Sequence, residues 1–260
     1  MIKIGLLGCG NIGSYIARAV DSGKVRGSLI SVYDKDCSKA RYLASRLKRK
    51  PRVCSAFDEL LGADVIVEAA SQKAVRDFAL KALSSGKDVV VMSSGALLDK
   101  KLFNDMLSAA RRNNVRIYVP SGALCGIDGV KAASMGKIRS VLLQTTKPPT
   151  SIPEYISVKK RKVIFNGPAS RAVKLFPANI NISAVLSLAG IGAGKTSVKI
   201  IVDPKARRNT HEVFLEGDAG KLYSRVENVP SPTNPRTSYL ACLSAIKMLN
   251  ELNDIVKIGT

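Results

Sequence analysis

The segment Ile2–Gly13, IKIGLLGCGNIG, constrains the fold of this chain more than any other. Its first six residues are mostly apolar, as in a buried strand, and they run directly into the pattern Gly-x-Gly-x-x-Gly. The first glycine of this pattern permits a tight turn, the second lets backbone approach a pyrophosphate, and the third allows close packing of helix on strand. A helix is expected next, with one buried face formed by Ile12, Ile16, Ala19 and Val20. The segment therefore predicts a strand, turn and helix that hold the phosphates of a dinucleotide at the helix N-terminus.

An acidic residue follows the second predicted strand, Leu29–Tyr33. Asp34 lies 21 residues beyond Gly13, which is near the spacing of a carboxylate that accepts hydrogen bonds from a ribose diol. Such an acid favours NAD, because it would repel the 2′-phosphate of NADP. The neighbouring cations Lys35, Lys39 and Arg41 weaken this exclusion, so the use of NADP stays open.

Strands and helices continue to alternate through the first half of the chain. Strands are predicted at Val65–Ala70, Asp88–Ser93 and Arg116–Pro120, with helices at about 72–85 and 100–113 between them. This alternation indicates a parallel sheet with right-handed crossovers, whose ligands gather at the carboxyl ends of the strands. Small residues at those ends leave room for a nicotinamide. The predicted cofactor-binding residues are Gly8, Gly10, Asn11, Ile12, Gly13, Asp34, Ala69, Ala70, Ser71 and Ser93.

The pattern changes after Ile127. Strands of an antiparallel sheet are predicted at 140–146, 162–166, 196–203, 212–216 and 222–226, and helices near 170–175, 181–189 and 238–252. The predicted fold class is α/β, with an N-terminal doubly wound Rossmann domain over residues 1–122 and a second, α+β domain for the substrate over residues 123–260. The C-terminal helix, at about 236–252, is expected to pack back on the first domain through Leu240, Leu243, Ile246 and Leu249.

One segment of the second half resembles a phosphate loop. The run Ala189–Thr196, AGIGAGKT, fits a relaxed form of that motif. A true phosphate loop follows a strand and opens a helix, whereas here a helix precedes the run and a strand follows it. We interpret the run as the end of a helix and a turn, with no ATP or GTP site.

Composition excludes several classes of protein. The five cysteines are scattered without a C-x-x-C pair and the chain has one histidine, so no metal site of the zinc type is expected and the protein is expected to be reduced and cytoplasmic. The sequence contains no run of about 18 apolar residues, so no membrane span is predicted. The N-terminus does not have the pattern of a signal peptide.

The chain is strongly basic, because its 41 Lys and Arg against 20 Asp and Glu give a net charge of +21. Because these cations are spread along the chain and no nucleic-acid motif accompanies them, a surface that attracts small anions is favoured over nucleic-acid binding.

Four segments resemble the family of L-aspartate dehydrogenases. They are Tyr118–Ala123, the run from Phe165 to Ala184, Asp203-Pro204 followed by Asn209–Glu212, and Pro230–Ser238. The resemblance covers nearly the whole chain in the expected order. The departures are Cys125, where glycine is common, and Ser183, where alanine is common, and neither removes a polar group that the chemistry needs.

The resemblance implies an NAD(P)-dependent oxidative deamination of L-aspartate to iminoaspartate. The product would hydrolyse to oxaloacetate and ammonia or supply quinolinate and thus NAD biosynthesis. A homodimer, with a Rossmann domain joined to a substrate domain, is also implied. In this family the catalytic residue is a histidine, which corresponds to His211. The resemblance also implies that Ala123 binds the cofactor, together with Asn181 rather than Asn179.

The only histidine, His211, suits this chemistry. Hydride transfer from the substrate Cα requires a neutral amine, and an imidazole can accept the ammonium proton near neutral pH. Glu212 is expected on the opposite side of the strand, so Asp203 or Asn209 is the expected orienting partner. The substrate carboxylates need cationic or polar partners, and the candidates are Arg171, Lys174, Asn179, Arg236, Thr237 and Ser238.

Two other interpretations remain at this point. Among enzymes, the alternative is a related NAD(P)-dependent amino-acid or semialdehyde dehydrogenase. From another class, the chain could be a non-catalytic dinucleotide sensor or a basic protein that binds nucleic acid.

Overall fold

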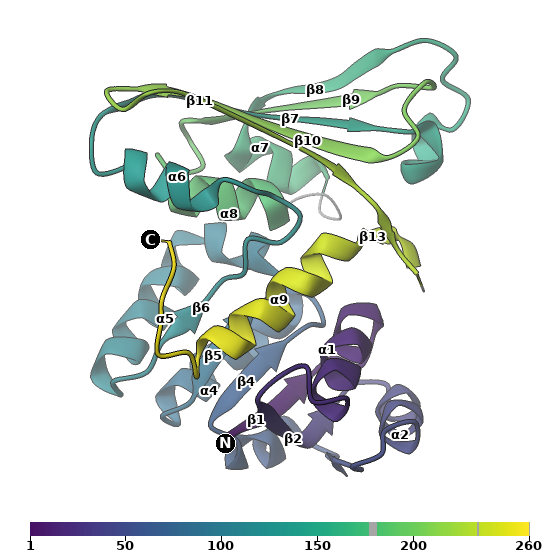
Figure 1. Cartoon of the computed structure of the whole chain (residues 1–260), viewed down its shortest axis with the longest axis vertical. Helices are drawn as coiled ribbons and strands as arrows, with labels where there is room; N and C mark the ends of the chain where they lie inside the picture. Colours follow the sequence, from purple (N-terminus) through teal and green to yellow (C-terminus); the bar gives the residue numbers. More distant parts are fainter. Residues whose placement is uncertain (177–180, 233, 260) are drawn as a thin grey trace. The chain divides into compact units, whose positions relative to one another are not determined.

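The computed structural model describes residues 1–176, 181–232 and 234–259. The chain divides into two compact units, Met1–Pro120 with Cys242–Lys257, and Ser121–Ala241 with the C-terminal residues from Ile258. Each unit has its own sheet (Figure 1). No helix in the described part of the chain combines the length and the apolar character needed to cross a membrane.

The first unit contains a six-stranded parallel sheet in the order β3-β2-β1-β4-β5-β6. From β1 the chain moves outward to β2 and β3, and from β4 it moves outward in the opposite direction. Right-handed crossovers in opposite directions place helices on both faces of the sheet, so the predicted doubly wound Rossmann fold is confirmed. The strands are β1 Ile2–Leu7, β2 Gly27–Tyr33, β3 Arg52–Val53, β4 Val65–Glu68, β5 Asp88–Val91 and β6 Ile117–Tyr118.

The crossovers of the first unit are mostly helical. The predicted helix at 72–85 is one continuous helical segment that contains a π-helical turn, and two predicted strands end earlier than expected, at Glu68 and Val91. The elements at Cys37–Ser45, Arg52–Val53, Phe57–Gly62 and Ser94–Leu98 were not predicted. The helical elements are α1 Asn11–Asp21, α2 Cys37–Ser45, η1 Phe57–Gly62, α3 Gln72–Ala74, η2 Val75–Ala79, α4 Leu80–Ser84, η3 Ser94–Leu98 and α5 Lys100–Arg112.

The C-terminal helix α9, Tyr239–Glu251, completes the core of the first unit from its residue 242 onward. Ala245 and Leu249 are fully buried in the same cluster as Ile4 and Leu6 of the sheet. The predicted apolar face was wrong at Leu243, which is 41% exposed, and Leu240 belongs to the second unit. The buried face instead contains Cys242, Ala245 and Leu249, whose small members let the helix approach the sheet closely.

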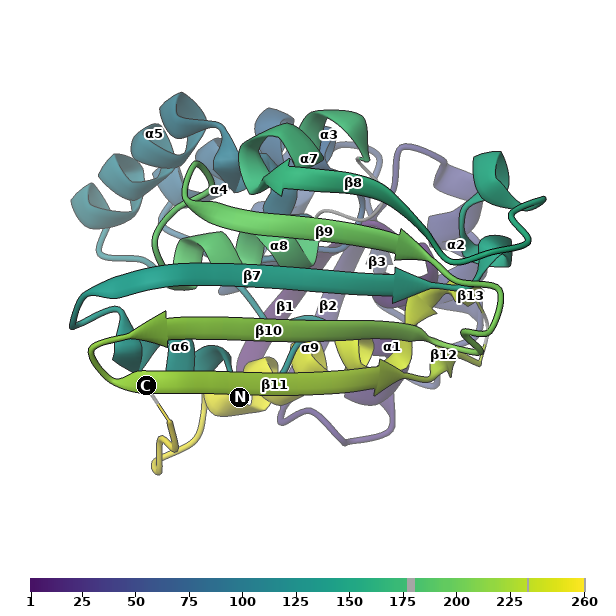
Figure 2. The same ribbon diagram turned by 90° about the horizontal axis from the view of Figure 1, so that it is seen from above.

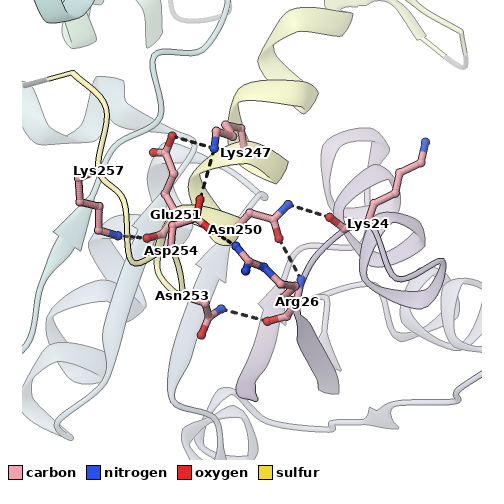
Figure 3. A network of polar contacts seen from close by, with 8 residues as sticks. All are labelled: Lys24, Arg26, Lys247, Asn250, Glu251, Asn253, Asp254 and Lys257. Atoms are coloured by element: carbon pink, nitrogen blue, oxygen red, sulfur yellow. Dashed lines mark hydrogen bonds and ion pairs between the residues drawn. The ribbon is translucent and has the colours of Figure 1, made fainter.

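A polar network fixes the C-terminal end of α9 to the segment that precedes β2 (Figure 3). The side-chain amide of Asn250 donates to the carbonyl of Lys24 at 2.7 Å and accepts from the backbone N–H of Arg26 at 2.9 Å. Asn253 donates to the carbonyl of Arg26 at 3.0 Å, and Asp254 forms an ion pair with its guanidinium. These contacts join segments more than 220 residues apart in sequence.

The second unit contains a five-stranded sheet in the order β11-β10-β7-β9-β8 (Figure 2). The prediction of an antiparallel sheet was wrong for one pair, because β7 and β9 run parallel, from Val141 opposite Thr196 to Lys147 opposite Val202. Parallel strands need a long crossover. The chain provides it by passing through β8 and two helices before β9 enters beside β7. The strands are β7 Ile138–Lys147, β8 Lys162–Pro168, β9 Thr196–Val202, β10 Asn209–Gly217 and β11 Gly220–Asn228.

The helices α6 Ile127–Ala133, α7 Ala169–Leu175 and α8 Asn181–Ala189 cover one face of this sheet (Figure 1). Their apolar residues pack with Leu143, Val198 and Leu215 from three strands. Short elements complete the unit, namely η4 Pro149–Ser151, η5 Pro153–Tyr155, and the strands β12 Pro230–Ser231 and β13 Asn234–Ser238. The run Ala189–Thr196 is, as predicted, the end of a helix and a turn before a strand.

Candidate functional site

The glycine turn after β1 has the geometry that a dinucleotide requires. Gly8 has φ +100°, and a Cβ there would lie 2.7 Å from the carbonyl group of Ala69. A Cβ at Gly13 would lie 2.0 Å from the carbonyl oxygen of Gly8, whereas a Cβ at Gly10 would meet nothing within 4 Å. The first and third glycines are thus required by packing, and the second faces open space. The residues present therefore fit a pyrophosphate at the N-terminus of α1.

Asp34 lies at the end of β2 and connects to this turn. Its Oδ2 accepts a hydrogen bond from the backbone N–H of Cys9 at 2.8 Å, and its Oδ1 accepts from that of Asp36 at 2.9 Å. A carboxylate has about four lone-pair sites, so capacity remains for a ribose diol. Lys39, one of the cations that left NADP use open, has its ammonium 3.7 Å from Asp36. Its charge is thus partly balanced within the chain.

The loops after β4 and β5 contain the other predicted cofactor residues of the first unit. Ala70 and Ser71 are exposed, and Ser71 accepts a hydrogen bond from the backbone N–H of Ala74 at 3.2 Å. Ser93 is buried, and its hydroxyl donates to Glu68 at 2.9 Å. Sequence reasoning missed Glu68, although an acid at the end of an apolar strand is itself a signal that a buried polar group is needed there.

His211 lies on β10 in the second unit, directly opposite Thr145 of β7. The imidazole is 5% exposed, and its Nδ1 is 3.1 Å from Oγ1 of Thr145. The prediction of Asp203 or Asn209 as the orienting partner was wrong, because the neighbouring strand β7 provides that partner. Asn209 instead accepts from the Ser151 hydroxyl at 3.2 Å, while the Asp203 carboxylate accepts from the backbone N–H of Lys205 at 2.8 Å.

The opposite face of β10 has a different character. As predicted, Glu212 points away from His211, and it accepts hydrogen bonds from Gln144 at 2.8 Å and Tyr223 at 2.7 Å. This face also has a hollow of about 640 Å³ whose lining includes Glu212 and several arginines. Neither His211 nor Thr145 lines this hollow, so it is separate from the buried cluster.

Lys147 completes the buried polar cluster. It follows Val141, Leu143 and Thr145 on the same face of β7 and is only 7% exposed. Burial lowers the pKa of the Lys147 ammonium to about 8. Burial, and secondly the charge of Lys147, lower the pKa of His211 to about 3. At neutral pH the cluster therefore contains a protonated lysine beside a neutral imidazole.

Sequence reasoning also missed Lys147. The alternation of buried residues along 141–147 could have placed it on the inner face of the strand, but the residue type argued for solvent. The signal available in the sequence was a lysine at a position where the alternation of the strand predicts a buried side chain.

The remaining predicted residues lie in the second unit, and their roles stay predictions. Ala123 is buried, and its carbonyl accepts from Asn228 at 3.2 Å, whereas Asn181 is exposed at the start of α8. Arg171 and Lys174 are exposed on α7. Thr237 and Ser238 are half-buried in β13, and Asn179 and the side chain of Arg236 lie outside the described part of the chain. Among the described residues, no group of three or more His, Cys, Asp or Glu could hold a metal ion.

Comparison with known proteins identifies the family. Residues 128–252 match the model of the aspartate dehydrogenase C-terminal domain, and residues 8–120 match the NAD-binding domain of homoserine dehydrogenase. L-Aspartate dehydrogenase from Methanosarcina barkeri is 47% identical over 271 residues, with 100% of both chains covered. The chain belongs to the L-aspartate dehydrogenase family. The enzyme of that name from Methanocaldococcus jannaschii is 42% identical, again with 100% of both chains covered.

Solved structures agree with this membership. Aspartate dehydrogenase from Thermotoga maritima superimposes with a TM-score of 0.83 at 26% identity, and both chains are covered completely. Scyllo-inositol dehydrogenase from Lactobacillus casei, solved with NAD(H) and scyllo-inositol, has a TM-score of 0.60 at 15% identity, which shows a shared fold alone. The family and the NAD-binding domain make the protein an NAD-dependent oxidoreductase, so the family and the cofactor predicted from sequence are confirmed.

Proposed function

We propose that the protein oxidises L-aspartate to iminoaspartate, which hydrolyses to oxaloacetate and ammonia. One observation carries the proposal, namely the buried cluster of His211, Thr145 and Lys147 at one end of a mostly apolar sheet face. A base beside a cation suits an amino acid whose ammonium must lose a proton and whose carboxylates must be held. NAD, when bound, accepts a hydride from the substrate Cα.

His211 acts as the acid and base of this reaction. Its imidazole is neutral at pH 7, because burial and Lys147 lower its pKa to about 3. The ring can accept the substrate proton at Nε2 in the tautomer whose Nδ1–H donates to Oγ1 of Thr145. In the unbound site the imidazole is a weak base, and substrate binding must raise its basicity.

The substrate itself supplies that change. Bound aspartate brings its two carboxylates beside His211 and Lys147, and an opposite charge favours the protonated form of a base. Lys147 pairs with one carboxylate, and the negative charge of the substrate then offsets the positive charge that lowers the His211 pKa. A second carboxylate adds to this effect, so aspartate activates the base more strongly than alanine, which has only one carboxylate.

Other residues hold the two ligands. The glycine turn and Asp34 bind the pyrophosphate and the adenosine ribose of NAD, with NADP as a second possible cofactor, and Ala123 and Asn181 act at the nicotinamide end. The remaining substrate contacts come from the predicted set Arg171, Lys174, Asn179, Arg236, Thr237 and Ser238. The first unit thus serves the cofactor and the second the substrate.

The cellular setting follows from the chemistry and the surface. Iminoaspartate is a precursor of quinolinate, so the enzyme would supply NAD biosynthesis. The five cysteines are free thiols, which fits the cytoplasm. The outer face of the second sheet exposes Phe214 and Tyr223, at 39% and 54%, and we assign it to a homodimer contact.

A substrate screen tests the proposal. NADH formation is followed by absorbance with L-aspartate, homoserine, L-glutamate and L-alanine, each with NAD and with NADP. We expect kcat/KM to be highest for L-aspartate by at least about 100-fold. A higher value for homoserine or glutamate would favour a related dehydrogenase. Binding of NAD without turnover of any of the four substrates would favour a sensor.

A further inference from the structure

We propose that Glu68 is a positioning residue of the cofactor site. Its buried carboxylate joins the loops that follow β4 and β5, and so fixes the backbone surface on which the nicotinamide half of NAD lies. This inference rests on NAD as the cofactor of the proposed function, but it does not depend on which substrate is oxidised.

Four donors converge on the two oxygens of Glu68. Oε1 accepts from the backbone N–H groups of Ala70 and Ser71, both at 2.8 Å, and from the hydroxyl of Ser93 at 2.9 Å. Oε2 accepts from the backbone N–H of Ser93 at 2.9 Å. Ala70 and Ser71 follow β4, whereas Ser93 follows β5, so a single side chain holds loops from two adjacent strands.

In the described part of the chain, the Glu68 carboxylate is held by uncharged donors, namely backbone N–H groups and a hydroxyl. Glu68 is 1% exposed, and no Lys or Arg of the described chain forms an ion pair with it. Burial raises its pKa, while the hydrogen bonds from Ser93, Ala70 and Ser71 act in the opposite direction. Burying a carboxylate without a cation is unfavourable. A purely structural link between two loops could use an uncharged side chain, so the carboxylate indicates a site where ordered backbone matters.

The position of these loops in the sheet identifies what they contact. The order of the strands reverses between β1 and β4, and a dinucleotide binds across the carboxyl ends of the strands at such a point. The turn at Gly8 packs directly against Ala69 and Ala70. Because Asp34 receives the adenosine ribose on the β2 side, the other half of the dinucleotide extends over the loops after β4 and β5.

Binding of NAD and of ADP-ribose to Glu68→Gln tests the proposal. ADP-ribose lacks the nicotinamide, and an amide nitrogen cannot accept the hydrogen bonds that a carboxylate oxygen accepts. By calorimetry without aspartate, we expect the Kd for NAD to rise about tenfold or more, since a hydrogen bond to a charged group is lost. The Kd for ADP-ribose should stay within about twofold, a selectivity that general destabilisation of the domain would not produce.

Glu59→Gln is the matched control. The Glu59 carboxylate accepts from the N–H groups of Ser55 and Ala56 and from the Ser55 hydroxyl, and it also pairs with the Arg52 guanidinium. It lies in η1 at the amino end of β4, away from the cofactor edge. This variant should bind both ligands as the wild type does.

A milder variant keeps the test decisive if Glu68→Gln does not fold. Ser93→Ala removes one of the four donors and leaves the carboxylate in place. It should weaken NAD a few-fold and leave ADP-ribose unchanged. Equal weakening of both ligands, or unchanged NAD binding, would overturn the proposal for either variant. Because no amino-acid substrate is present, an enzyme that failed to oxidise aspartate could still support the role of Glu68.

Discussion

Replacing Lys147 by methionine separates the stability of the second unit from its function. The ammonium of Lys147 lies in the buried polar cluster with His211 and Thr145, next to the apolar residues Val141 and Leu143 of β7. Methionine keeps an unbranched side chain of similar length and removes the charge. We expect the variant to unfold less readily than the wild type and to turn over L-aspartate at least about 100-fold more slowly.

The magnitude follows from the pKa of the lysine. Burial lowers this pKa from 10.5 to about 8, and each pH unit of that difference corresponds to about 1.4 kcal/mol. The buried ammonium therefore costs roughly 3 kcal/mol of folding free energy at pH 7, as an upper bound on the gain from Lys147→Met. Hydrogen bonds of the ammonium that methionine cannot replace reduce this gain.

The stability difference between Lys147→Met and the wild type should depend on pH. Between pH 8 and 10.5 the unfolded chain keeps the lysine proton and the folded chain has lost it, so wild-type stability rises with pH in this window. Lys147→Met lacks this contribution. Its advantage should be full below pH 8 and nearly absent above pH 10.5.

Urea unfolding of both proteins at several pH values from 7 to 11 measures the difference. A stabilised variant whose advantage fades with pH would support the reasoning. A variant that is less stable than the wild type by the same amount at every pH would refute it, because the ammonium would then be a well-satisfied structural group.

Three further predictions concern the same framework. Thr145→Val should lower kcat about tenfold with NAD binding unchanged, because His211 loses the hydrogen bond at Nδ1 that orients its ring. Thr145→Ser should restore most of the rate, and equal rates for all three proteins in the NADH assay would contradict this. Lys147→Met should raise the His211 pKa from about 3, because the charge of Lys147 is one of the two causes that lower it. NMR titration of the only imidazole measures this pKa, and an unchanged value would show that the two groups do not interact. Asn250→Ala should lower the free energy of unfolding by about 1 kcal/mol, because two hydrogen bonds to the segment before β2 are lost. A melting temperature equal to that of the wild type would show that water replaces these hydrogen bonds.

Local patterns predicted the first unit well. The glycine turn and the alternation of apolar runs can each be recognised within a short segment of sequence, and the structure contains the turn and the strands that they predict. The parallel pairing of β7 with β9 could not be predicted in the same way. Alternation fixes which face of a strand is buried, but it does not specify the neighbouring strand.

The candidate site was predictable only in part for the same reason. Motif resemblance identified His211, and strand alternation placed Glu212 on the other face. The partner of the imidazole, Thr145, lies 66 residues earlier in the chain. Only the register between β7 and β10 brings the two together, and no single segment of the sequence encodes that register.

Steady-state turnover and NAD binding of His211→Ala test whether the imidazole takes part in the reaction. We expect kcat for L-aspartate to fall by about 10² to 10⁴, the usual contribution of general acid and base catalysis. The Kd for NAD should stay within about twofold of the wild-type value. A variant that keeps the wild-type kcat would show that the imidazole has no part in the reaction.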